Sequence, residues 1–120
     1  MDIDQIRSYC LSKNGFSEDF PFDQDVLAFK VLGKIFALID LKKWEAGSKA
    51  INLKCDPNYA ELLRQEYSSI RAGYHMNKKH WNTLYIHEGE LPPKFICELI
   101  EHSYQMVLKG MPKKTRDSLH

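Results

Sequence analysis

The sequence has few cysteines, and none of them form a closely spaced pair. Cys10, Cys55 and Cys97 are odd in number and far apart, which argues against a zinc ribbon and against a disulfide framework. Long hydrophobic runs are missing as well, because the longest, Ile35 to Ile39, is far shorter than the roughly 20 residues of a membrane-spanning helix. The N-terminus, Met1-Asp2-Ile3-Asp4, lacks the basic start and apolar run of a secretory signal. We therefore expect a cytoplasmic protein with reduced thiols and no membrane association.

Neither sign of charge is in large excess. The net charge is +1 at pH 7, so composition alone does not indicate a strongly basic nucleic-acid-binding protein. The distribution is uneven, however, because residues 1–27 carry six acidic and two basic side chains, whereas residues 28–54 carry six lysines and two acidic side chains. This asymmetry permits a basic face on a near-neutral protein.

The signatures of common enzyme active sites are also absent. The sequence contains no Gly-x-Ser-x-Gly, no glycine-rich phosphate loop and no His-Glu-x-x-His, the motifs that position nucleophiles, phosphates or catalytic zinc. Glu98 and Glu101 are three residues apart and are more typical of a solvated helix face than of an acid–base pair. A Cys–His or Ser–His pair could arise only through the fold. We expect no enzymatic activity and no cofactor.

The patterns that are present predict one domain over residues 1–112, followed by a charged tail at 113–120. In chain order we expect a short helix from about residue 3 that ends near Asn14-Gly15, an aromatic loop packed on the core at 16–22, and two strands meeting at Gly33 within 26–39. A polar connection at 41–49, a strand at 50–54 and a helix that starts at Asp56-Pro57 follow. The remaining elements are a polar turn-like segment at 70–80, a strand at 81–87, and a last helix between Pro92-Pro93 and Gly110. The signals are period-2 and period-3.6 hydrophobic spacing, helix caps and turn residues. The first strands predict a three-stranded antiparallel meander.

The segment Gly73-Tyr-His-Met-Asn-Lys-Lys-His-Trp-Asn-Thr83 resembles the MmcQ/YjbR family of small bacterial proteins. Further marks of the family follow in the same order, and together they cover roughly residues 3 to 112. These marks are Phe20-Pro-Phe22, Phe29 to Lys34 with Phe36-Ala-Leu38, Asn52 to Pro57, and Ser103-Tyr104. The chain departs from the pattern at Ala72, where similar members have proline, and at Asp23, where glycine is common.

The resemblance implies an α+β fold related to frataxin-like sheets, with about three helices packed on one face of an antiparallel sheet. It also implies DNA binding through projecting hairpins, an arrangement described as a double wing. Because a fold alone does not determine function, the DNA-binding role also depends on which side chains the sequence supplies.

One short segment gathers the residue types that bind nucleic acids. Its members are Arg71, Tyr74, His75, Asn77, Lys78, Lys79, His80 and Asn82. Lysines neutralise phosphates, asparagine can address a base edge, and aromatic rings can stack on exposed bases. The alternative is an exposed loop in which Tyr74 and Trp81 are core anchors.

Lys30 and Lys34 flank the Gly33 turn, where they could contact phosphate at a hairpin tip. They could equally protect a strand edge from pairing with other chains. His75 and His80 supply only two ligands, fewer than zinc requires, so we expect no bound metal.

We therefore predict a monomer that binds DNA. A non-enzymatic protein-interaction domain that uses the same surface is the main alternative, and the frataxin-like resemblance leaves a small-ligand or metal pocket as a third.

Overall fold

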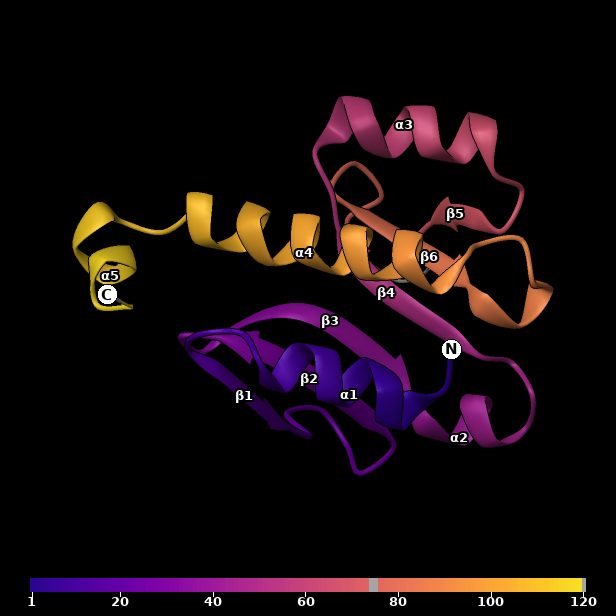
Figure 1. Ribbon diagram of the computed structural model, residues 1–120, viewed down its shortest axis with the longest axis horizontal. Coiled ribbons are helices and arrows are strands. Elements are labelled where there is room, and N and C mark those ends of the chain that lie inside the picture. Colours follow the sequence, from indigo (N-terminus) through magenta and orange to yellow (C-terminus); the bar gives the residue numbers. More distant parts are fainter. Residues whose placement is uncertain (74–75, 120) are drawn as a thin grey trace.

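The computed structural model describes residues 1–73 and 76–119 (Figure 1). The strands among these residues form one six-stranded antiparallel sheet in the order β1-β2-β3-β4-β6-β5. They are β1 (Phe16–Asp19), β2 (Val26–Val31), β3 (Lys34–Asp40), β4 (Ala50–Lys54), β5 (Ile70–Ala72) and β6 (Trp81–Tyr85). The predicted α+β fold and the β2-β3-β4 meander are therefore confirmed.

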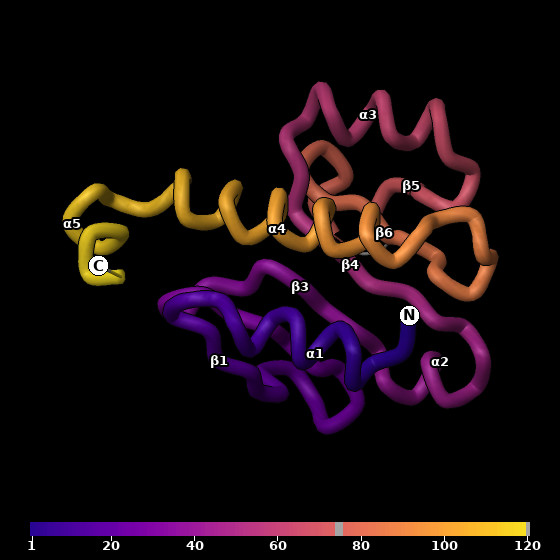
Figure 2. The backbone as a smooth tube through the Cα atoms, viewed as in Figure 1, coloured from indigo at the N-terminus to yellow at the C-terminus, as the bar shows by residue number. Residues whose placement is uncertain are grey.

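The long helices lie side by side on one face of the sheet, with α4 (Pro93–Lys109) between α1 (Ile3–Leu11) and α3 (Pro57–Glu66) (Figures 1 and 2). The Tyr104 hydroxyl of α4 donates to the carbonyl oxygen of Asn14, just after α1, at 2.6 Å. On the other side of α4, the ring of His102 packs edge-on against Tyr59 of α3, with centroids 5.1 Å apart. The apolar side chains between these helices and the sheet form one continuous core. No helix in the described part of the chain is long and apolar enough to cross a membrane.

Local chemistry accounts for the elements that the sequence predicts. α3 begins where the Asp56 side chain accepts a hydrogen bond from the Tyr59 backbone at 3.1 Å and Pro57 occupies the first helical position, a typical N-terminal cap. The β2–β3 turn has positive φ at both central residues, 49° at Leu32 and 82° at Gly33. Two left-handed central residues match the twist of an antiparallel hairpin.

Other segments differ from the predictions. The expected aromatic loop contains a strand, because β1 pairs with β2. Its Phe16 ring packs on Phe29 with centroids 5.5 Å apart, whereas Phe20 and Phe22 are 48% and 66% exposed and do not join the core. The polar segment from residue 70 begins with β5, which pairs with β6.

The ends of two later segments also differ. β6 ends at Tyr85, because the chain turns through the 3-10 helix η1 (Ile86–Glu88) into Gly89, whose φ is 75°. The expected tail forms a short helix, α5 (Lys113–Asp117), after which Leu119 packs near Gly15.

The sheet divides near its middle. β3 and β4 pair at only two positions, Ala37 with Leu53 and Leu38 with Asn52, and β2 carries a bulge between Phe29 and Lys30. Beyond these pairs the fully buried Ser103 of α4 bridges the two strands, since its hydroxyl donates to the Phe36 carbonyl at 2.6 Å and accepts from the Lys54 amide at 2.8 Å. The β2–β3 hairpin and the β4-β6-β5 half are therefore separated at this end of the sheet.

Candidate functional site

Two connections carrying predicted lysines leave the divided end of the sheet. Lys34, the first residue of β3, lies on the hairpin-turn side of the Ala37–Leu53 pair. In the other half of the sheet, Lys54 pairs with Trp81, and the Cys55 amide donates to the His80 carbonyl at 2.8 Å. The β2–β3 turn and the β5–β6 connection therefore face the same direction. Lys34 is exposed in the first, and Lys78 and Lys79 are exposed in the second.

The β5–β6 connection meets the start of α3. Lys78 and Lys79 line a shallow cavity of about 370 Å³ together with Arg64 and with Pro57, Asn58 and Glu61 of the first helical turns. Three cationic groups thus face one carboxylate at the start of a helix, a combination that favours an anion. Among the residues that the structure describes, Lys34, Lys78 and Lys79 take part in no ion pair.

Arg64 of α3 fixes the position of this connection. Its Nε donates to Asn82 Oδ1 at 2.7 Å, and its Nη2 donates to the Lys78 carbonyl at 2.6 Å. Asn77 supports the same turn, because its side-chain oxygen accepts from the Lys79 amide at 3.0 Å. This role of Arg64 cannot be predicted from the sequence, since no spacing pattern relates α3 to a loop that follows Arg64 by 14 residues.

Asn82 is not available to a nucleic acid. It is 1% exposed and faces α3, where its Nδ2 donates to the Ala60 carbonyl at 3.4 Å. The sequence places Asn82 next to the basic segment, but alternate residues of a strand point to opposite faces, and Asn82 points toward the helices. Asn82 is therefore a buried partner of Arg64, whose other hydrogen bond holds the Lys78 carbonyl.

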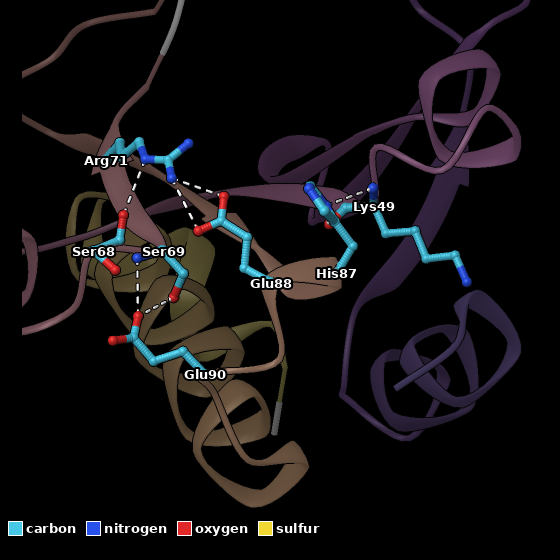
Figure 3. Close-up of polar contacts among 7 residues, drawn as sticks. All are labelled: Lys49, Ser68, Ser69, Arg71, His87, Glu88 and Glu90. Atoms are coloured by element: carbon cyan, nitrogen blue, oxygen red, sulfur yellow. Dashed lines mark hydrogen bonds and ion pairs between the residues drawn. The ribbon is translucent and has the colours of Figure 1, made fainter.

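Arg71 and Lys30 are already paired within the protein. Arg71 donates twice to Glu88, at 2.9 and 2.7 Å, and once to the Ser68 carbonyl at 3.0 Å (Figure 3). Its guanidinium also lies 4.4 Å from the centre of the Tyr85 ring. Lys30 forms an ion pair with Asp19 across β1 and β2 at 2.9 Å, and because β2 is paired on both sides Lys30 does not lie on an open strand edge.

The polar side chains near Arg71 form hydrogen bonds mainly with other groups of the protein. The Ser69 amide and hydroxyl donate to Glu90 at 2.9 and 2.5 Å (Figure 3), and these hydrogen bonds lower the pKa of the Glu90 carboxyl. His87 Nδ1 accepts from the Lys49 amide at 3.1 Å, again a contact within the protein. This corner is therefore less suited to a polyanion than the lysine-bearing connections.

Of the two histidines in the predicted DNA-binding segment, the structure describes only His80. His80 is half-buried just before β6. Tyr74 and His75 lie outside the described residues. Within residues 1–73 and 76–119, no three His, Cys, Asp or Glu side chains gather as a metal-binding group would require.

Comparison with known proteins agrees with this architecture. A model of the YjbR family matches residues 11–106. The chain is 35% identical to the uncharacterized protein YjbR of Escherichia coli K12 over 119 residues, which is 99% of this chain and 98% of that protein. It is 41% identical to YbdF of Escherichia coli O157:H7 over 95 residues, or 79% of this chain and 75% of that protein.

Solved structures show the same fold. The crystal structure of Deinococcus radiodurans protein DR2400, described as a DUF419 domain, superimposes with a TM-score of 0.86 at 40% identity, covering 98% of this chain and 86% of that one. A Pseudomonas syringae protein crystal structure gives a TM-score of 0.70 at 30% identity, covering 88% of this chain and 98% of that one.

Proposed function

We propose that this chain, which belongs to the YjbR family, binds DNA through lysines at the ends of two β-hairpins. The observation that carries the proposal is the common direction of the β2–β3 turn and the β5–β6 connection, which present Lys34 on one side and Lys78 with Lys79 on the other. Their ammonium groups are exposed and form no ion pair within the described residues. Flexible point charges of this kind suit phosphate contacts.

The same geometry favours binding with little sequence preference. Most side chains suited to reading base edges are engaged elsewhere, because Asn82 is buried and Arg71 is paired with Glu88. The exposed Asn77 uses its side-chain oxygen for the Lys79 amide. Phosphate contacts position a protein on DNA but carry no direct sequence information. We therefore expect similar affinities for unrelated sequences and a strong dependence on salt.

A binding role also agrees with the state of the thiols. Burial raises the pKa of both Cys10 and Cys55 to about 12. A thiol with such a pKa is protonated at neutral pH and is a poor nucleophile. We propose that neither cysteine has a catalytic role.

The test is fluorescence anisotropy with labelled DNA across a salt series. Replacing both lysines (Lys78→Glu with Lys79→Glu) should weaken binding at least about tenfold at low salt and reduce the slope of log affinity against log salt by about two. The matched control is Lys42→Glu with Lys94→Glu, which changes the net charge equally at exposed positions in α2 (Leu41–Glu45) and at the start of α4, at the other end of the sheet (Figure 1). The control should bind nearly as the parent protein does.

Unchanged affinity in the folded Lys78/Lys79 variant would refute the proposed contacts. If the parent protein fails to bind DNA even at low salt, the alternative is a protein-interaction domain that uses the same lysines. That alternative predicts an acidic protein partner recovered after nuclease treatment and lost in the Lys78/Lys79 variant.

A further inference from the structure

The sheet face opposite the long helices carries a cavity that the phosphate contacts do not use. It has a volume of about 530 Å³, within the range typical of small-ligand sites. Its floor is formed by Leu38 of β3, Asn52 of β4 and Thr83 of β6, which are neighbours across three adjacent strands. Phe22 and Met76 line it from the β1–β2 and β5–β6 connections. It therefore brings together two of the segments that resemble the family, Phe20 to Phe22 and Gly73 to Thr83.

Asn52 presents a hydrogen-bonding group to this cavity in a fixed orientation. The Thr83 hydroxyl donates to Asn52 Oδ1 at 2.5 Å, so the amide nitrogen is directed away from Thr83. Among the described residues, this nitrogen has no hydrogen-bond partner. The side-chain oxygen keeps a second lone pair, and the amide therefore offers one donor and one acceptor side by side. The edges of nucleic-acid bases present the complementary pair.

Part of the remaining lining suits the flat faces of a base, and the polar part includes Asp40, whose carboxylate accepts from the Lys43 amide at 3.0 Å. Phe22 is 66% exposed, so its ring is accessible to a ligand. Val26 and Tyr85 add apolar and aromatic surface on the same side, and one face of the Tyr85 ring is covered by Arg71 at 4.4 Å. Aromatic rings beside a polar anchor on an open sheet face are the features used by proteins that stack single-stranded bases.

The position of the cavity links it to the proposed phosphate contacts. Met76 belongs to the same connection as Lys78 and Lys79, which lie beside α3, and Lys43 lines the cavity itself. A strand whose base enters the cavity would have Lys43 beside it and could continue past the end of the sheet to Lys78 and Lys79. Bases of an intact duplex are stacked and paired, and they cannot reach such a floor without being extruded.

We propose that this cavity accepts one unpaired base, so that the chain prefers single-stranded DNA to duplex DNA. This inference rests on the proposed DNA binding. Because the edge of every base offers a donor next to an acceptor, Asn52 should impose only a weak preference among the bases.

The experiment compares one labelled oligonucleotide, single-stranded and annealed to its complement, by anisotropy. The parent protein should bind the single strand at least about tenfold more tightly, in line with the contribution of one stacked base. Phe22→Ala should lose most of that advantage and leave duplex affinity unchanged, and Asn52→Leu should act in the same direction. Phe20→Ala is the matched control, because Phe20 is also exposed but does not line the cavity. Melting temperatures verify that each variant is folded.

The outcomes separate the two proposals. Equal affinity for both forms of DNA, or equal weakening of both by Phe22→Ala, would overturn the base-binding cavity and leave the lysine contacts intact. The Lys78/Lys79 variant should weaken both forms, since it removes phosphate contacts. Absence of binding to either form by the parent protein would overturn the proposed function, and the cavity proposal with it.

Discussion

At the scale of single residues, His102 links the pH of the solution to the stability of the fold. Its Nε2 accepts a hydrogen bond from the Asp56 amide at 3.2 Å, directly at the start of α3. Burial lowers the pKa of His102, and the nearby Asp56 carboxylate opposes this effect only in part. Only the neutral ring can accept this hydrogen bond, so protonation breaks a contact that helps to hold α3 against α4.

The lowered pKa of His102 predicts a loss of stability in mild acid. Below the ordinary pKa of 6.5 the unfolded chain binds a proton that the folded chain resists, so stability falls as the pH drops. In His102→Gln the side-chain oxygen keeps the acceptor and does not titrate. Thermal melts between pH 5 and 7.5 should show a shallower decline for His102→Gln than for the parent protein. The same decline in both proteins would mean that other groups cause the pH dependence.

Individual residues also show what could be predicted from the sequence. Asp56-Pro57 predicts the start of α3, because the helix cap is a local interaction between residues that are close in the chain. The burial of Asn82 could not be predicted, because only the folded position of β6 shows that this side chain faces α3. Leu38, Asn52 and Thr83 could not be grouped in advance, because they come from three strands and meet only through the pairing of the sheet.

At the scale of elements, the accuracy of the predictions follows the strength of the local signal. The β2–β3 hairpin and α4 have strong hydrophobic periods bounded by glycine or proline, and both were predicted. β1 was missed because Glu18 and Asp19 make it too polar for a strand pattern, and its identity depends on pairing with β2. The lysine connections were recognised by composition, whereas their common direction follows from the pairing of β4 with β6.

The relation between α3 and the β5–β6 connection gives a prediction at this scale. Arg64 is the contact that holds the Lys78 carbonyl to the helix. Arg64→Ala should release residues 77–80, which hydrogen exchange would detect as faster exchange of their amides, and should weaken DNA binding several-fold. It should also cost about 1–3 kcal/mol of stability, because Asn82 is left with a buried, unpaired oxygen. Gln65→Ala, at an exposed neighbouring position, is the control.

Faster exchange at residues 77–80 without any loss of affinity would show that the lysines need no fixed position. Unchanged exchange would show that Arg64 does not order the connection. Either result would separate the role of the helix in stability from its role in binding.

At the scale of the whole molecule, the divided sheet raises the question of whether the domain unfolds as one unit. The β2–β3 half and the β4-β6-β5 half share only two residue pairs between β3 and β4. Against this, the buried side chains of both halves belong to one continuous core that includes α1 and α4. Cys10 of α1 and Cys55, just after β4, are both buried in that core, and each therefore reports on one half.

We expect the two thiols to become reactive together. Burial raises the pKa of each to about 12, so neither should react with a thiol reagent at neutral pH until the core opens. In a Cys97→Ser background, which removes the half-buried third thiol, the labelling of Cys10 and Cys55 should require the same free energy of opening across a urea series. That free energy should equal the value for global unfolding, because one core lost in a single step exposes both thiols.

If Cys55 reacts at a lower free energy of opening than Cys10, the β4-β6-β5 half opens on its own. The two-pair junction between β3 and β4 would then act as the boundary between two cooperative units, and the lysine connections on either side of it could move independently to meet a nucleic acid.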